Sequence, residues 1–489
     1  MCMDQAGPAH PGEPDGAETR RGERVAIIGL GRSNRPLVRW FLARGARVAV
    51  FDRKTGEELG ESLHELDGLE VERRLGPGYL DEGLAGFDRL VLAPGMRIDL
   101  PAVEEARRRG ARIDGEIAIL LRELARRRAC VVGITGTSGK TTTTTLTGQI
   151  FRRAGRRTWV GGNIGDPLID RVEKIGAGDV VVLELSSFQL RLVDRSPQVA
   201  AILNIRPNHL DIHPSLEEYT ESKRRIVRFQ TAGDVAVLNA EDPACRASEA
   251  PGRRFWFALE RGSLPEEGEG AAWSERGRLR LRWLGREEEL GPESEIPLRG
   301  RHNVANVLAA AAMARSLGVE PGVVWATVRA FHPVEHRLEL CGHVGGATWV
   351  NDSIATAPDR TVAGLDAFTQ PVVLIAGGYD KHLSYRPLAE RMLTGLRAAI
   401  LLGQTAPVIA RELEMVSAER GVAPPPVERV GSLEEAVEAA RRRARPGDVV
   451  LLSPASASYD MFRDYEERGR RFKQLVAEME KEEREGGKR

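Results

Sequence analysis

Short runs of apolar residues alternate along the chain with amphipathic stretches of helical period. The runs that predict buried strands are 25–28, 48–52, 90–92, 131–134, 180–184, 200–205, 348–350, 372–376, 399–402 and 449–452. Helix signals follow most of these runs, and such alternation is typical of parallel sheets covered by helices. The pattern therefore predicts an α/β fold.

The pattern resets twice, which divides the chain into three α/β domains. The first 23 residues, rich in Gly, Pro, Asp and Glu, are predicted to form a disordered tail. The first and third domains are predicted to be Rossmann-like, and the central one to contain a parallel sheet of the P-loop ATPase type. The predicted domains are 24–117, 118–333 and 334–489.

The composition argues against a nucleic-acid or membrane protein. The 489 residues carry 71 basic and 71 acidic side chains, so no net charge draws the chain to nucleic acid or to an anionic bilayer. No apolar run approaches the ~18 residues that a membrane-spanning helix needs. The four cysteines are scattered without paired spacing, which favours neither a disulfide nor a zinc site. We expect a cytoplasmic monomer whose partners are small-molecule substrates.

A glycine-containing turn directly after the run 131–134 is the strongest candidate site. Its sequence, GTSGKT over residues 136–141, would free backbone N–H groups at the start of a helix and so bind an anion. Lys140 would reach the outer phosphates of a nucleotide, and the Thr141 hydroxyl would meet Mg²⁺. Ile134 replaces the first glycine of the usual GxxxxGK[ST] pattern, so a plain strand–turn–helix is the alternative.

Two polar residues stand where strands of the same predicted sheet end. Glu184 closes the run 180–184, and His209 follows the run 200–205. Ligands of α/β proteins gather at the carboxyl ends of parallel strands, which favours Mg²⁺ ligation by both residues over a role as helix caps. Imidazole is nevertheless an unusual partner for so hard a cation.

Lysine is rare in this chain, since eight of the 71 basic residues are lysines and three of these lie in the C-terminal tail. Lys223 falls on the same face of a predicted helix as Tyr219 and Ile226. An inward ammonium is costly unless it is paired or neutralised, and burial would shift its pKa and make it reactive. The alternative is a lysine that snorkels at the helix margin.

A second, weaker glycine turn opens the first domain. The run 25–28 continues into Gly29 and Gly31, and the next run ends at Asp52. An acid about 20 residues after such a turn is typical of dinucleotide-type βαβ units. Because Asn34 takes the place of the third glycine, nucleotide-ligand binding and simple tight packing both stay open.

Seven stretches follow one another in a fixed order. They are GTSGKT (136–141), ELSSFQ (184–189), NHLD (208–211), HNVAN (302–306), HR (336–337), NDS (351–353) and LSPASAS (452–458). Together these motifs resemble those of the Mur ligases of peptidoglycan synthesis, over residues 24 to about 475. The short first domain and the SPASAS stretch make the likeness closest to the glutamate-adding branch of that family. Ser138 departs from the family's usual asparagine.

The resemblance implies an ATP-dependent ligase that adds D-glutamate to UDP-N-acetylmuramoyl-L-alanine through an acyl phosphate, with ATP and Mg²⁺ as cofactors. It implies catalytic roles for Lys140, Glu184, His209 and Lys223. The residues implied for ATP are Gly136, Thr137, Ser138, Gly139, Lys140, Thr141, Thr142, Asn303, Arg337 and Asp352. Those for the UDP-sugar are Arg32, Ser33, Asp52, Asn163 and Ser186, and those for the amino acid are Thr356, Lys381, Ser458 and Tyr465. The implied metal ligands are Thr141, Glu184, His209 and Lys223, the last as a carbamate.

Three alternatives to this function stay open. Ile354 stands where the glutamate-adding branch usually has a lysine, and a less common branch that adds L-glutamate resembles this pattern. A second alternative is another Mur-type or folylpolyglutamate ligase. The third is a nucleotide-binding scaffold without activity, against which the presence of Glu184, His209 and Lys223 argues.

Overall fold

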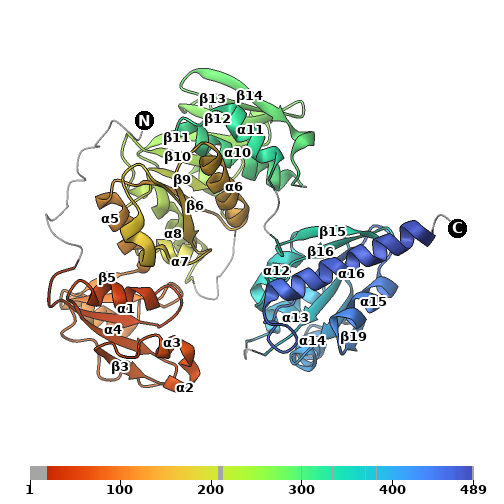
Figure 1. Ribbon diagram of the computed structural model, residues 1–489, viewed down its shortest axis with the longest axis horizontal. Coiled ribbons are helices and arrows are strands. Elements are labelled where there is room, and N and C mark those ends of the chain that lie inside the picture. Colours follow the sequence, from red (N-terminus) through yellow and green to blue (C-terminus); the bar gives the residue numbers. More distant parts are fainter. Residues whose placement is uncertain are drawn as a thin grey trace. The chain divides into compact units, whose positions relative to one another are not determined.

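The computed structural model describes residues 19–206, 213–298, 300–331, 335–368, 370–380 and 383–486. The chain divides into two compact units, Met1–Phe331 and His332–Arg489. The first unit contains two sheets and the second contains one, each with helices packed on it (Figure 1). In the part of the chain that the structure describes, no helix is both long and apolar enough to cross a bilayer.

The first sheet has five parallel strands in the order β3-β2-β1-β4-β5. Its strands are β1 (Arg24–Ile28), β2 (Arg47–Asp52), β3 (Val71–Leu75), β4 (Arg89–Leu92) and β5 (Arg112–Asp114). The helices of this part are α1 (Arg35–Leu42), α2 (Gly56–Leu59), α3 (Glu61–His64) and α4 (Pro101–Arg108). Alternate residues of β1 enter different cores: Val25 and Ile27 pack with α1, whereas Ala26 and Ile28 pack with α4.

The second sheet has nine strands in the order β14-β13-β12-β11-β10-β9-β6-β8-β7. Strand β13 is antiparallel to both of its neighbours, β12 and β14, and the other pairs are parallel. Its strands are β6 (Cys130–Thr135), β7 (Thr158–Gly162), β8 (Val180–Glu184), β9 (Val199–Ile202), β10 (Val235–Asn239), β11 (Arg253–Ala258), β12 (Gly270–Glu275), β13 (Arg278–Trp283) and β14 (Arg286–Pro292). Because β6 is central and parallel to both neighbours, the loop after it lies beside the carboxyl ends of β8 and β9.

Helices cover both faces of the second sheet. They are α5 (Glu116–Arg126), α6 (Lys140–Arg153), α7 (Ser187–Leu190), α8 (Leu216–Arg228), α9 (Pro243–Arg246), α10 (Arg301–Ser316) and α11 (Pro321–Arg329), with a 3₁₀ helix at Leu168–Lys174. The helices α6 and α10 pack together on one face, while α5 and α8 cover the other (Figure 1). The alanine-rich α10 is buried nearly all round, which lets it approach α6 closely.

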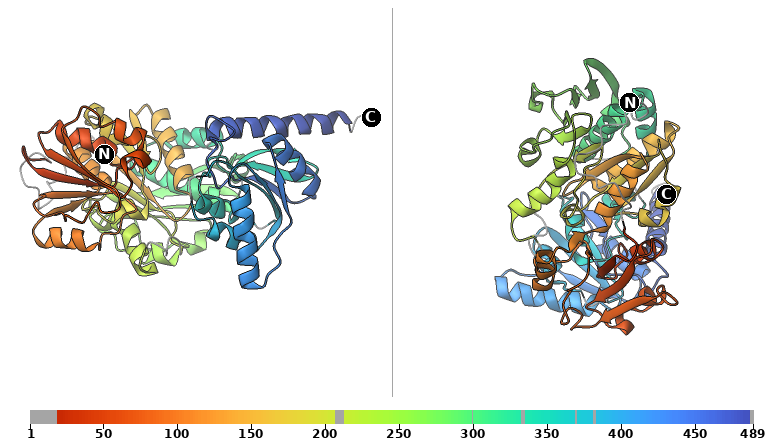
Figure 2. Two further views of the ribbon diagram at one scale, coloured as in Figure 1. Left: turned by 90° about the horizontal axis from the view of Figure 1, so that it is seen from below. Right: turned by 90° about the vertical axis from the view of Figure 1, so that its left-hand side faces the viewer.

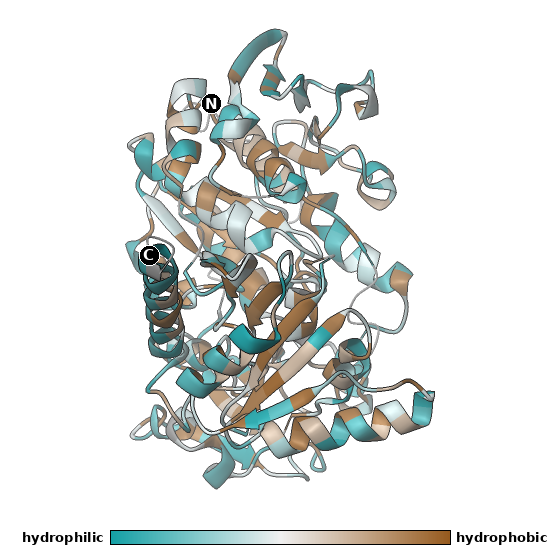
Figure 3. Ribbon diagram, turned by 90° about the vertical axis from the view of Figure 1, so that its right-hand side faces the viewer, coloured by the Kyte–Doolittle hydropathy of each residue, from teal (hydrophilic) through white to brown (hydrophobic). Residues whose placement is uncertain are grey.

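The second unit has a six-stranded sheet in the order β15-β16-β20-β17-β18-β19, parallel except for β15. Its strands are β15 (Glu339–Val344), β16 (Ala347–Asn351), β17 (Val372–Gly377), β18 (Leu396–Leu402), β19 (Val427–Val430) and β20 (Val449–Leu452). Its helices are α12 (Pro358–Leu365), α13 (Arg386–Met392), α14 (Ala406–Arg420), α15 (Leu433–Arg443) and α16 (Tyr465–Gly486). Figure 3 shows apolar strands between helices with polar outer faces. Figure 2 shows α16, which packs along β15, as one long straight helix.

These observations confirm the predicted α/β class with parallel sheets. The strand predicted over 200–205 is shorter than expected, since β9 ends at Ile202. The chain leaves the sheet at that point because Asn204 turns toward the loop after β6. The predicted domain bounds stay predictions.

Candidate active site

The loop between β6 and α6 is built so that a side chain at position 139 is excluded. Gly139 has φ of +82°, and a Cβ there would lie 2.4 Å from Asn306 Oδ1. The Lys140 ammonium donates to the carbonyl oxygens of Gly136 at 2.9 Å and Thr137 at 3.1 Å, so it lies across the loop. Asn306 was not predicted as a site residue; it donates at 3.1 Å to Asn303 Oδ1, and so joins the predicted nucleotide residue Asn303 to the loop.

Asn204 fixes the middle of this loop. Its Oδ1 accepts from the Ser138 backbone N–H at 2.9 Å, and its Nδ2 donates to the Ser138 carbonyl at 3.1 Å. The Thr137 N–H donates to the Asn204 carbonyl at 3.0 Å. Ser138 Oγ also donates to Asn204 Oδ1, at 3.3 Å, so Asn204 holds both the main chain and the side chain of Ser138. Nothing in the sequence singles out Asn204 beyond its place just after β9.

Asn204→Ala should weaken ATP binding to the full chain about 5- to 20-fold, because the two hydrogen bonds from the Asn204 side chain to the Ser138 main chain are lost. Titration calorimetry with ATP checks this expectation. The affinity for a UDP-sugar, measured in the same way, serves as the control and should stay within about twofold. An unchanged ATP affinity would mean that the loop keeps its shape without Asn204.

Thr141 and Glu184 meet at the first turn of α6. Thr141 Oγ1 donates to Glu184 Oε2 at 2.7 Å, and Asn163 Nδ2 donates to Glu184 Oε1 at 2.8 Å. Glu184 is 2% exposed, and Gly162 keeps its surroundings tight, since a Cβ there would lie 2.2 Å from the Glu184 carbonyl oxygen. A buried hydroxyl and carboxylate are hard oxygen donors, so this pair fits Mg²⁺. Among the described residues no group of three or more His, Cys, Asp or Glu side chains could hold a metal, and His209 lies outside those residues.

Lys223 points inward from α8 and reaches the same loop. Its ammonium, 2% exposed, donates to the Gly136 carbonyl at 2.9 Å and lies 4.7 Å from the centre of the Tyr219 ring. The Tyr219 hydroxyl lies 2.9 Å from Thr137 Oγ1, so α8 touches the loop at two points. Burial lowers the pKa of Lys223 well below its ordinary value, and the nearby Lys140 ammonium lowers it further. The predicted inward lysine is confirmed, and the snorkelling alternative is wrong.

The residues predicted for the UDP-sugar lie in two places of the first unit. Asp52 accepts from the Leu30 N–H at 2.7 Å and so holds the glycine turn after β1, beside the half-buried Ser33. The exposed Arg32 guanidinium contacts the Gly165 carbonyl, in the loop that follows β7 and carries Asn163.

Ser186 and Thr142 complete the predicted set of the first unit. Ser186 caps α7, because its hydroxyl accepts from the Gln189 N–H at 3.2 Å and the Gln189 side chain accepts in return from the Ser186 N–H at 3.0 Å. Thr142 is half-buried in the first turn of α6. The UDP-sugar and ATP assignments of these residues stay predictions.

The second unit holds the other predicted residues near the carboxyl ends of its parallel strands. Asp352 follows β16 and accepts from Ser453 Oγ at 2.7 Å, while the exposed Arg337 lies in the segment before β15. Among the described residues, the buried Ser458 hydroxyl has no hydrogen-bond partner, and the Tyr465 hydroxyl lies 3.5 Å from Glu466 Oε1. Thr356 is half-buried, and its N–H donates to the Ile354 carbonyl at 2.9 Å. Lys381 lies outside the described residues.

Asp352→Asn should stabilise the protein at pH 7.5. Burial raises the pKa of Asp352 from 3.8 to about 6, an effect that the hydrogen bond from Ser453 reduces but does not cancel. Because the folded-state pKa is the higher one, the wild-type chain loses stability as the pH rises from about 4 to about 6, by at most about 3 kcal/mol. Urea unfolding should therefore show equal stability of the two proteins near pH 4 and a more stable variant above pH 6.5. A difference that does not change with pH would contradict this.

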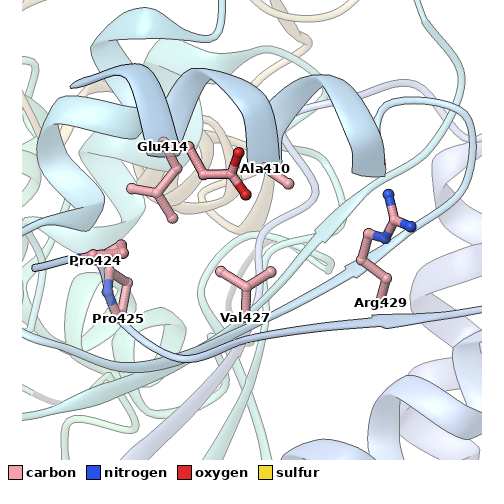
Figure 4. A pocket seen from close by; sticks show the side chains of 7 residues that line it. Ala410, Glu414, Pro424, Pro425, Val427 and Arg429 are labelled. Carbon is pink, nitrogen blue, oxygen red and sulfur yellow. The ribbon is translucent and has the colours of Figure 1, made fainter. Parts of the chain in front are cut away.

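The second unit contains a cavity that none of these residues lines. It has a volume of about 570 Å³ and is lined by Ala410, Leu413, Glu414, Pro424, Pro425, Val427 and Arg429, between α14 and β19 (Figure 4). None of the predicted site residues contributes to it. We therefore place the candidate active site by the contacts of the loop after β6 and not by this cavity.

Three family models match successive parts of the chain. The Mur ligase MurD-like N-terminal domain matches residues 23–115, the Mur ligase middle domain 134–314, and the Mur ligase glutamate ligase domain 336–456. A UDP-N-acetylmuramoylalanine–D-glutamate ligase from Symbiobacterium thermophilum is 48% identical over 454 residues, which cover 93% of this chain and 98% of that protein. The chain belongs to the Mur ligase family.

A second relative agrees with this assignment. A UDP-N-acetylmuramoylalanine–D-glutamate ligase from Acetivibrio thermocellus is 42% identical over 467 residues, which cover 94% of this chain and 97% of that protein. The predicted resemblance to the Mur ligases and to their MurD branch is thereby confirmed, and the protein is a ligase. A solved structure, the UDP-N-acetylmuramate-alanine ligase MurC from Thermotoga maritima, is 20% identical, with a TM-score of 0.48, and covers 93% of this chain and 99% of that one.

Proposed function

We propose that this Mur ligase uses ATP to join D-glutamate to the alanine carboxyl of UDP-N-acetylmuramoyl-L-alanine, a step of peptidoglycan synthesis that serves cell-wall growth and division. The names of the two relatives described above, and their full-length similarity, support this choice of substrates. The observation that supports the chemistry is the meeting of Thr141, Glu184 and Lys223 at one phosphate-type loop. ATP and the UDP-sugar are cytoplasmic compounds, so we place the reaction in the cytoplasm.

The reaction has two steps. The alanine carboxylate of the UDP-sugar takes the γ-phosphoryl group of ATP, which gives an acyl phosphate and ADP. The free amine of D-glutamate then attacks the acyl carbon, and the tetrahedral intermediate expels inorganic phosphate and leaves an amide. Phosphoryl transfer depends mainly on positioning and charge neutralisation. Lys140 and the N–H groups at the start of α6 supply both, as soon as the ammonium leaves the Gly136 carbonyl for the phosphates.

Mg²⁺ would be held by the Thr141 hydroxyl and the Glu184 carboxylate, with His209 and Lys223 as further ligands. When bound, the ion supplies positive charge beside the transferring phosphoryl group. Asn163 orients the Glu184 carboxylate through the 2.8 Å hydrogen bond from its amide. This contact supports a role for Asn163 at the phosphate end of the site, in addition to the UDP-sugar role predicted for it.

Lys223 would act as a carbamate. Burial favours the neutral form of its amine by lowering the pKa. The nitrogen of that neutral amine adds to the carbon of CO₂ and loses one proton, so that the side chain becomes a carbamate anion. Such an anion suits a metal site better than an ammonium does, and arginine cannot form it. The inward position of Lys223 beside Gly136 supports this proposal.

The test of the function separates the two enantiomers of glutamate. The purified chain is given UDP-N-acetylmuramoyl-L-alanine, ATP and Mg²⁺ with D-glutamate or L-glutamate, and phosphate release and the coupled product are measured. We expect coupling of the D form only. Exclusive use of the L form would favour the alternative that Ile354 suggests, and ATP turnover with a folate but not with the UDP-sugar would favour a folylpolyglutamate ligase.

A further inference from the structure

A buried hydrogen-bonded chain of three side chains lies beside the loop after β6. The Ser187 hydroxyl is 2.9 Å from His213 Nε2, and His213 Nδ1 contacts the Glu218 carboxylate. Ser187 and His213 are 3% and 1% exposed. These two side chains, in the Ser–His–Glu order, are therefore buried and hydrogen-bonded to each other inside the protein.

The chain joins two elements that carry different parts of the candidate site. Ser187 begins α7, three residues after Glu184 at the end of β8. Glu218 lies in the first turn of α8, and α8 also carries Tyr219 and Lys223. The helices α7 and α8 pack against each other (Figure 1). The contacts of His213 with Ser187 of α7 and Glu218 of α8 place it between these two helices.

The imidazole of His213 is held on every side. It stacks on the Phe188 ring with centroids 4.8 Å apart and planes inclined by 12°, and the Tyr219 ring meets it edge-on at 5.1 Å. Both ring nitrogens have a partner, and a carboxylate at Nδ1 favours the tautomer in which Nε2 accepts from the Ser187 hydroxyl.

Glu218 is itself held from two further sides. It accepts from Ser222 Oγ at 2.9 Å and pairs with the Arg191 guanidinium at 3.0 Å. Burial raises the pKa of Glu218, but the hydrogen bonds from His213 and Ser222 outweigh it, so the pKa lies below its ordinary value. The carboxylate therefore stays charged and keeps its hold on His213 at neutral pH.

We propose that His213 is a positioning residue of the ligase reaction. By joining Ser187 to Glu218, it fixes the distance between α7, which follows Glu184, and α8, which carries Tyr219 and Lys223. Both sides contact the segment between β6 and the start of α6. Glu184 contacts Thr141, while Tyr219 and Lys223 of α8 contact Thr137 and Gly136. A displacement of about 1 Å in such a site costs about 100-fold in rate. Loss of the hydrogen bonds between Ser187, His213 and Glu218 should therefore slow phosphoryl transfer without removing any group that contacts substrate.

The test compares variants of His213 that keep the contact with Ser187, the contact with Glu218, or neither. His213→Gln brings an amide toward Ser187, His213→Asn brings one toward Glu218, and His213→Ala keeps neither. The proposal rests on the function proposed above, so the wild-type chain is assayed first with UDP-N-acetylmuramoyl-L-alanine, ATP, Mg²⁺ and D-glutamate. If the wild type does not couple D-glutamate, the proposed function is overturned. The variants are then assayed with the amino acid that the wild type does couple.

We expect kcat to fall about 100-fold in His213→Ala and less in the two amide variants, while KM for the amino acid changes less than about threefold. Ser187→Ala should lower kcat at least about fivefold. The double variant that combines Ser187→Ala with His213→Gln should have a kcat no lower than that of the slower single variant, because both substitutions act through the same Ser187–His213 contact. His343→Ala, which removes an exposed histidine of the second unit, is the control and should keep the wild-type kcat.

A purely structural role predicts a different outcome. It would lower the melting temperature and the folded fraction, but kcat per folded molecule would stay within about twofold of the wild type, and this result overturns the proposal. If His213→Ala does not fold, Ser187→Ala decides in its place, since it removes one hydroxyl from a packed site. An unchanged kcat in the folded Ser187→Ala protein likewise overturns the proposal.

Discussion

Lys223→Arg should lower the ligase activity of the full chain by about 100-fold or more, and Lys223→Ala by as much. The Lys223 ammonium occupies a buried place at 2.9 Å from the Gly136 carbonyl, in contact with the Tyr219 ring. A guanidinium is larger, always charged and unable to add to CO₂, so it would put a permanent cation where the proposed reaction uses an anion. Turnover with saturating substrates, measured as phosphate release, checks this expectation.

Short carboxylic acids or high bicarbonate should restore part of the activity of Lys223→Ala, because the shortened side chain leaves room for an added carboxylate. The same additions should not help Lys223→Arg, whose side chain fills the space. Lys174→Arg is the matched control, since Lys174 is an exposed lysine at the end of a 3₁₀ helix and should tolerate the change. Near-normal activity of Lys223→Arg would refute the carbamate role.

The elements that position the site could be predicted from the sequence because their signals are local. In β1, alternate residues enter two different cores, and such a run reads as a buried strand without knowledge of its neighbours. The inward place of Lys223 followed from its spacing to Tyr219 and Ile226 along α8. The glycine turn before Lys140 was recognisable because only a few residue types suit the start of a phosphate-type loop.

The contacts that hold the loop could not be predicted, since they join residues far apart in sequence. Asn204 bonds Ser138 from 66 residues away, and Lys223 bonds Gly136 from 87 residues away. Polar side chains such as Asn306 and His213 carry no periodic signal, and the direction of each depends on the packing of the elements around it. Sequence spacing placed Glu184 at a strand end, but it could not show that Asn163 donates to its carboxylate.

Glu184→Gln should lower kcat about 1,000-fold and raise the Mg²⁺ concentration needed for half-maximal activity. The Glu184 carboxylate accepts from Thr141 on one oxygen and from Asn163 on the other, and an amide can accept at one of these places only. With its carbonyl oxygen toward the Asn163 amide, the NH₂ group of the glutamine would meet the Thr141 hydroxyl, which would then accept a hydrogen bond instead of donating one. The loss of charge also weakens one of the proposed Mg²⁺ ligands, because a neutral amide binds this cation less strongly than a carboxylate does.

Asp179→Asn is the matched control for this change. Asp179 is also a buried carboxylate, directly before β8, and it accepts from Trp159 Nε1 at 2.9 Å and from the Gly176 N–H at 3.1 Å. It lies at the amino end of the strand whose carboxyl end carries Glu184, so its replacement should cost stability but leave kcat and the Mg²⁺ dependence unchanged. If both variants show the same fall in kcat, the effect of Glu184 is one of folding, and the Mg²⁺ assignment fails. If only Glu184→Gln shifts the Mg²⁺ titration, the Glu184 carboxylate acts on the ion, because loss of a buried carboxylate at the amino end of the same strand then leaves the titration unchanged.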